Sequence, residues 1–171
     1  MLKGEDPIIL LKLASKRDRW TLRSLESEIA ISRSVIHRSL GRLAQAGLLD
    51  ATHRVNVAQA EEFLIHGMRY VFPPIQQGAT RGNPTAWAAA PLEDELAPSN
   101  DLPPVWPDPE GETRGIALQP LHPAASEIYH RDKKLTEQLA LLDALRLGSP
   151  RIRGLAAKLL REHIAAEPKA T

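Results

Sequence analysis

The chain has 171 residues, no cysteine and a formal net charge of +1. This length allows one large domain or a small domain with an appendage, and the lack of cysteine excludes disulfides and thiolate metal sites. No apolar run approaches the roughly 20 residues that span a bilayer, and the first 20 residues lack the pattern of a signal peptide. We therefore expect a soluble, cytoplasmic protein with no membrane partner.

Charge is distributed unevenly along the chain. Residues 1–54 carry ten Lys and Arg against six Asp and Glu, residues 55–124 carry three against nine, and residues 125–171 carry nine against six. The acidic middle also holds 11 of the 14 prolines, between Pro73 and Pro123. Such blocks of charge predict segments that have different partners.

Two short helices are predicted first. Asp6 is a candidate N-cap for a helix that has Pro7 in its first turn and extends through Ser15. Thr21 can cap a second helix over residues 22–30. A full capping box needs Glu or Gln three residues later, where Ser24 stands, so the box is predicted to be incomplete.

A third helix is predicted between Ser32, its N-cap, and Gly47 at the C′ position. Its interior contains Gly41, which costs about 1 kcal/mol relative to alanine. Close approach of a DNA backbone or of the first helix would explain this glycine. The stretch "LLDATHRVNV", residues 48–57, is predicted to form two short extended pieces around a turn near Thr52.

The stretch "TLRSLESEIAISRSVIHRSLGRLAQAGLLD", residues 21–50, resembles the winged helix-turn-helix of bacterial repressors of the MarR and IclR type. The resemblance covers about residues 6–57. It rests on the helix around Leu25, on Ser32 at the start of the next helix, and on "AGLL" at its end. It implies an N-terminal DNA-binding domain over residues 1–57 of a dimeric transcriptional regulator.

Helical spacing also selects the candidate DNA contacts. With Ile36, Leu40 and Leu43 directed inward, the opposite face of the third helix is free to read bases or phosphates. The alternative is that its arginines only form the solvated face of an amphipathic helix. The predicted DNA-binding residues are Arg33, Ser34, His37 and Arg38 at the bases, Arg42 at phosphate, Arg54 at the minor groove or backbone, and Thr21, Lys16 and Arg17 before and at the second helix.

Residues 58–72 are predicted to form a linking helix and a strand, with "MRYVF" extended, and residues 73–125 a Pro-rich extended strap. Within the strap, Val105 and Trp106 can face residues 113–118 across a turn as a hairpin. Tryptophan in a chain so poor in aromatic residues favours a packed or binding role. The alternatives are a strap packed on the C-terminal helices and a partner-binding surface made by Arg81, Trp87, Trp106 and Arg114.

Residues 126–171 are predicted to form a helical hairpin. Gly148 ends its first helix, Ser149 caps the second, and Pro150 occupies the first turn of the second. Its apolar stripe requires burial against the strap and the linking helix, or across a two-fold axis. We expect this region to form the interface of a homodimer, since winged-helix repressors similar to this chain dimerise outside the DNA-binding unit.

The sequence therefore predicts a mainly α fold with a small β-ribbon. No nucleophile, phosphate-loop or HExxH motif is present, and His122 and His130 are isolated. We accordingly expect no enzyme activity, no cofactor and no metal. The predicted function is that of a sequence-specific DNA-binding transcriptional regulator, a dimeric repressor, with double-stranded DNA and a second copy of the chain as partners. The alternative is an antitoxin or other interaction module whose Pro-rich and C-terminal regions bind a cognate protein, while the winged helix controls the operon.

Overall fold

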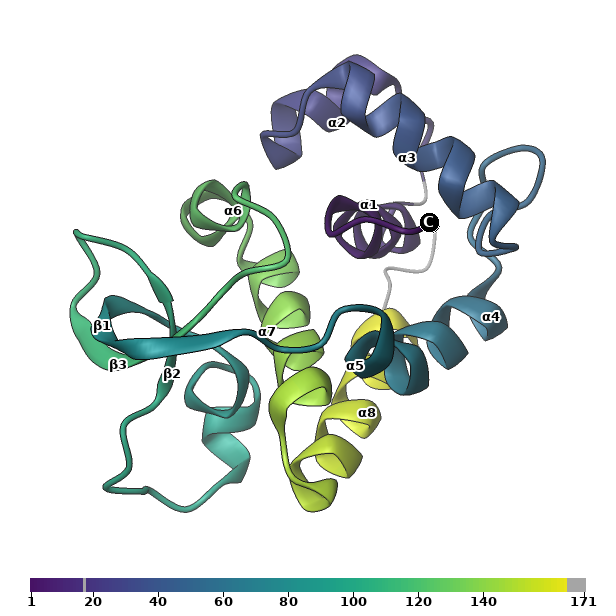
Figure 1. Ribbon diagram of the computed structural model, residues 1–171. Helices are drawn as coiled ribbons and strands as arrows, with labels where there is room; N and C mark the ends of the chain where they lie inside the picture. Colours follow the sequence, from purple (N-terminus) through teal and green to yellow (C-terminus); the bar gives the residue numbers. More distant parts are fainter. Residues whose placement is uncertain (17, 166–171) are drawn as a thin grey trace.

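Helices make up most of the structure, a computed structural model that describes residues 1–16 and 18–165, and the strands form one small mixed sheet (Figure 1). The helices are α1 (Glu5–Ala14), α2 (Leu22–Ile29), α3 (Arg33–Gln45), α4 (Val57–Glu62), α5 (Met68–Val71), α6 (Ala125–Arg131), α7 (Lys133–Leu147) and α8 (Pro150–Ala165). The strands are β1 (Gln76–Pro84), β2 (Pro104–Pro107) and β3 (Thr113–Leu118). Among the described residues, no helix is both long and apolar enough to cross a membrane.

Helix α1 begins at Glu5 with Gly4 as its N-cap, so the prediction of Asp6 as the N-cap is wrong. Asp6 instead lies in the first turn, where its Oδ2 accepts the backbone N–H of Lys3 at 2.7 Å, and Pro7 occupies the first turn as predicted. The four residues Ile8–Leu11 are all fully buried. A helix buried on all sides must have cover from more than one neighbour.

The start of α2 confirms Thr21 as an N-cap and corrects the prediction of an incomplete capping box. Thr21 Oγ1 accepts the N–H of Ser24 at 3.0 Å, and Ser24 Oγ accepts the N–H of Thr21 at 2.9 Å. Ser24 thus accepts the N–H of the N-cap residue, a role that glutamate or glutamine usually fills in a capping box. The chain passes from α2 to α3 through Ala30, which has left-handed backbone angles with φ 55°.

The end of α3 is a Schellman motif, which confirms Gly47 at the C′ position. The N–H of Leu48 donates to the carbonyl of Leu43 and that of Gly47 to Ala44, both at 3.0 Å. Gly47 has a φ of 79°, which glycine adopts without strain. The predicted ribbon beyond it is reduced to one antiparallel bridge, between Leu49 and Val55.

The chain stays helical from Val57 to Val71, so the strand predicted for "MRYVF" is wrong. α4 passes through a π-helical segment, Phe63–Gly67, directly into α5. Met68 is fully buried, and the carbonyl of Phe72 accepts a hydrogen bond from Nε of Arg146 at 2.7 Å. Packing against α7 therefore keeps this apolar segment helical where its composition is also compatible with a strand.

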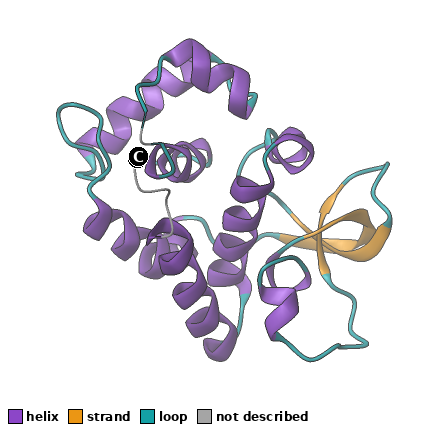
Figure 2. Ribbon diagram, turned by 180° about the vertical axis from the view of Figure 1, so that it is seen from behind, coloured by secondary structure: helices purple, strands orange, loops and turns teal. Residues whose placement is uncertain are grey.

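The Pro-rich segment contains the sheet, and its pairing differs from the predicted hairpin. β1 is antiparallel to both other strands, through pairs such as Asn83 with Trp106 and Thr80 with Gly115. β2 and β3 run parallel to each other. Both strands are antiparallel to β1, so they run in the same direction and cannot pair with each other as the two arms of a hairpin. Figure 2 shows the sheet at one edge of the helical body.

Helix α7 lies at the centre of the molecule, and its residues 138–146 are all buried. The apolar stripe of the C-terminal helices packs inside the chain, in one hydrophobic cluster that extends from Ile8 to Ile164. Gly148 ends α7 as predicted, and Ser149 Oγ accepts the N–H of Ile152 at 3.3 Å at the start of α8. The region predicted as the first helix of the hairpin is divided at Asp132 into α6 and α7, and residues 166–171 lie outside the described residues.

A buried polar cluster fastens the strap to α7. Asp143 Oδ2 accepts Oγ1 of Thr85 at 2.6 Å and Nε1 of Trp106 at 2.8 Å, while its Oδ1 accepts Nη1 of Arg146 at 2.9 Å. Burial raises the pKa of Asp143, and the charge of Arg146 opposes this rise. The prediction that the strap packs on the C-terminal helices agrees with this cluster.

Candidate nucleic-acid interface

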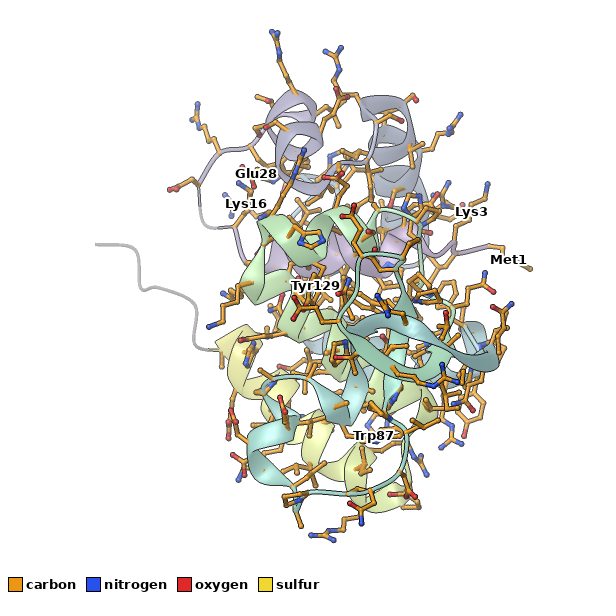
Figure 3. All side chains as sticks on the ribbon, turned by 90° about the vertical axis from the view of Figure 1, so that its left-hand side faces the viewer. Met1, Lys3, Lys16, Glu28, Trp87 and Tyr129 are labelled. Carbon is orange, nitrogen blue, oxygen red and sulfur yellow. The ribbon has the colours of Figure 1, made fainter. Side chains whose placement is uncertain are left out.

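Helix α3 has two distinct sides. Ile36, Leu40 and Leu43 are buried together with Ser39, and the spacing of these positions places them on the side that faces α1 and α2. The exposed residues of the opposite side are Ser34, His37, Arg38, Gly41 and Gln45. Ser34, His37 and Arg38, three of the four residues predicted to read bases, lie on this opposite side. Arg33 is exposed as the first residue of the helix, but it lies two turns before buried Leu40 on nearly the same line. Figure 3 shows nitrogen-tipped side chains that project from this end of the molecule.

The N-terminus of α3 is covered by a carboxylate. Oε2 of Glu26 accepts the backbone N–H of Arg33 at 2.7 Å and lies 3.3 Å from its Nε. The side chain of Arg33 remains 59% exposed. Within the described part of the chain, neither His37 nor Arg38 has an ion-pair partner. These two side chains are therefore the freest donors on the exposed face.

Arg42 is part of the structural core, which corrects its prediction as a phosphate contact. Its Nε donates to Asp6 Oδ2 at 2.9 Å, and its Nη2 donates to Asp6 Oδ1 at 2.8 Å and to Glu5 Oε1 at 3.0 Å. Asp6 is fully buried and also accepts Oγ of Ser39 at 2.6 Å. The hydrogen bonds to Asp6 raise the pKa of Arg42 against the effect of burial. Arg42 thus clamps α3 to α1.

Lys16 also has a structural partner, and this removes it from the free cations of the predicted interface. Its Nζ lies 2.7 Å from Glu28 Oε1 (Figure 3). Nζ of Lys12 lies 3.2 Å from the other Glu28 oxygen and 2.7 Å from Asp132 Oδ2. Arg17 lies outside the described residues, and Thr21 is exposed at the start of α2 while its hydroxyl caps that helix.

Arg54 is exposed beside a hollow of about 930 Å³. The turn that carries it is held by Asp50, whose Oδ1 accepts the N–H groups of Thr52 at 2.7 Å and Arg54 at 3.0 Å. The hydroxyl of Thr52 also donates to Asp50 Oδ1. This hydroxyl bond above all, together with the two N–H bonds, holds the pKa of Asp50 below its ordinary value. Arg19 and Trp20 line the same hollow, and the rings of Trp20 and His53 stack at 6.3 Å between centroids.

The four predicted partner-binding residues have different environments. Trp106 is 4% exposed and bonded to Asp143, so its assignment to a partner surface is wrong. Trp87 is half-buried against the hydrophobic core. Arg81 and Arg114 are exposed and stand directly opposite each other across β1 and β3. Like charges in this position destabilise a sheet slightly, and a role for the pair in partner binding stays a prediction.

Three residues of the candidate interface were missed from the sequence. Gln45 and Arg23 are exposed on α3 and α2, and Glu26 covers the start of α3. Gln45 follows Ser34 by three helical turns, so its position on the same face was readable from spacing. Glu26 has no such signal, because its partner Arg33 lies across the turn between two helices.

No protein-family model matches the chain, and neither a curated protein nor a solved structure does. Among the described residues, no group of His, Asp and Glu side chains is placed to hold a metal ion. The geometry of α2, α3 and the Asp50 turn is therefore the basis for a functional proposal.

Proposed function

We propose that the protein is a sequence-specific DNA-binding transcriptional regulator. In this proposal residues 1–57 act as a winged helix-turn-helix unit, with α3 as the recognition helix and the Asp50 turn as a short wing. The observation that carries the proposal is the exposed side of α3, where Arg38 and His37 are free of ion pairs in the described chain and Ser34 stands beside them. Arg33 is exposed at the first position of the same helix. The clamp from Arg42 to Asp6 holds the other side of the same helix rigidly.

The dimensions and chemistry of this face suit a major groove. A helix of 13 residues is about 20 Å long, and a groove about 12 Å wide admits it. Arg38 can donate two hydrogen bonds to the O6 and N7 atoms of guanine. Exposed Arg19, Arg23 and Arg54 supply phosphate contacts, which confer affinity without sequence preference. Occupation of an operator by this unit would block transcription by occlusion.

The homodimer expectation loses its original support, because the stripe of α7 is buried within the chain. A two-fold interface would therefore use another surface. The exposed apolar side chains nearest one another in sequence are Tyr70, Val71 and Ile75, at the connection between α5 and β1. Light scattering at micromolar concentration measures whether the free chain is a monomer or a dimer.

Binding-site selection from random duplexes, followed by fluorescence anisotropy, tests the DNA proposal. We expect the chain to enrich one sequence, and Arg38→Ala to lose roughly tenfold or more of its preference for that sequence over random DNA. Lys158→Ala is the control, because Lys158 is an exposed cation on α8, outside the proposed DNA-binding unit of residues 1–57. A wild-type chain without salt-sensitive affinity for any duplex would overturn the proposal.

A further inference from the structure

Neither a close contact nor a special backbone conformation within the chain explains the glycine at position 41. It lies in the interior of α3 and is exposed, and its backbone is not left-handed. A Cβ atom added at Gly41 would meet nothing within 4 Å. Close packing against α1 is therefore excluded as its explanation. Alanine at this position would make the helix more stable, since glycine loses more backbone entropy on folding.

The position of Gly41 on the helix is equally specific. At about 100° per residue, it falls between His37 and Arg38 and faces away from buried Leu43. Ser34 and Gln45 lie within about 40° of the same line, two turns before it and one turn after it. The middle of the exposed side of α3 is thus bare backbone, while cationic or polar side chains surround it.

We propose that Gly41 marks the point of closest approach between α3 and the floor of the major groove of duplex DNA. This inference rests on the proposed function. A methyl group at the centre of the face would contact the base edges first and lift the whole helix outward. The side chains around Gly41 would then lie too far from the base edges to form hydrogen bonds with them. Gly41 therefore sets the depth at which the helix is seated.

Deep seating assigns a role to Gln45 as well. With the middle of α3 on the groove floor, the side chains one turn beyond Gly41 reach base edges rather than phosphates. A glutamine amide can bond both N6 and N7 of adenine. Gln45 is exposed, and Gly41 and Gln45 share one line on the helix. We expect Gln45→Ala to reduce the discrimination at one adenine position roughly tenfold or more, with other positions unchanged.

The decisive experiment compares two glycine substitutions in the full chain. Gly41→Ala should raise the melting temperature by about 2–4 °C and weaken binding to the selected duplex roughly tenfold or more. Gly154→Ala is the matched control, because Gly154 is an exposed interior glycine of α8 whose added Cβ also meets nothing within 4 Å. It should give the same rise in melting temperature and leave DNA affinity unchanged.

Each outcome of the comparison is informative. A Gly41→Ala chain that binds the duplex as tightly as the wild type overturns the inference and leaves the proposed function intact. Equal loss of affinity in both variants also overturns it, because the effect would not be local to α3. Absence of DNA binding by the wild type itself defeats the proposed function. A more stable Gly41→Ala chain with weaker binding supports the seating of α3 on the groove floor.

Discussion

Arg38 and Arg42 are one turn apart on α3, yet they have opposite roles. Asp6 is fully buried, and a buried carboxylate is costly unless it is paired and hydrogen-bonded. Arg42 meets this need with two donors, and Ser39 and the Lys3 backbone supply two more. Arg38 is rotated by about 40° along the helix, away from α1, and remains exposed. A small rotation thus separates a structural clamp from a candidate base contact.

Arg42→Ala is predicted to lower the free energy of unfolding by about 3 kcal/mol or more, because it leaves the Asp6 carboxylate buried without its counter-charge. Thermal denaturation should show a fall in melting temperature of about 6–12 °C. Arg38→Ala, the control on the same helix, should stay within about 0.5 kcal/mol of the wild type. A stable Arg42→Ala chain that has lost salt-dependent DNA affinity would restore Arg42 to the phosphate contacts.

At the scale of elements, an ion-pair network joins α1 and α2 to the start of α7. Lys12 on α1 bonds both Glu28 on α2 and Asp132, the residue that caps α7. Burial alone would raise the pKa values of both carboxylates. The bonds from Lys16 and Lys12 to Glu28, and from Lys12 to Asp132, outweigh burial and hold both pKa values below their ordinary range. The charged forms therefore stabilise the contact between these helices.

This network predicts a specific acid sensitivity. Carboxylates with lowered pKa values contribute stability that is complete above the ordinary values of 4.5 for Glu28 and 3.8 for Asp132. The contribution is lost as the pH falls through the lowered values of the folded state. We expect Lys12→Met to reduce stability at pH 7 by about 1–2 kcal/mol, and this gap to narrow as the pH falls below the ordinary pKa values of the two carboxylates. Urea unfolding of the wild type and the variant, at pH 7 and at acid pH, measures this difference in stability. A difference that is independent of pH contradicts the prediction.

The elements that were predicted correctly depend on signals a few residues long. Gly47 ends α3 and Thr21 begins α2 through bonds that span three to five residues. The exposed face of α3 was predictable for the same reason, since its period lies within one helix. Arg42 was misassigned because Asp6 is 36 residues away. Trp106 was misassigned because Asp143 is 37 residues away. No local pattern encodes such partners.

At the scale of the whole molecule, α1 belongs to both halves of the chain. Figure 1 shows it end-on between α3 and α7, and it contacts both helices. The segment Ile8–Leu11 is fully buried, which neither helix alone could achieve. α2 and α6 are also linked, since Nη1 of Arg131 lies 3.5 Å from the carbonyl of Ser27. The DNA-binding unit predicted as residues 1–57 therefore shares its core with the remainder of the fold.

A fragment of residues 1–57 is accordingly predicted not to fold alone. Without α7 it exposes one side of α1, and the fragment is close to the length at which a single core becomes marginal. Circular dichroism should show little helix and no cooperative melting, whereas the full chain should unfold in one transition. DNA affinity should be lost with the fold, although every proposed base contact is present in the fragment. A folded fragment with the affinity of the full chain would instead show that α7 is dispensable, and that the burial of α1 overstates the coupling between the two halves.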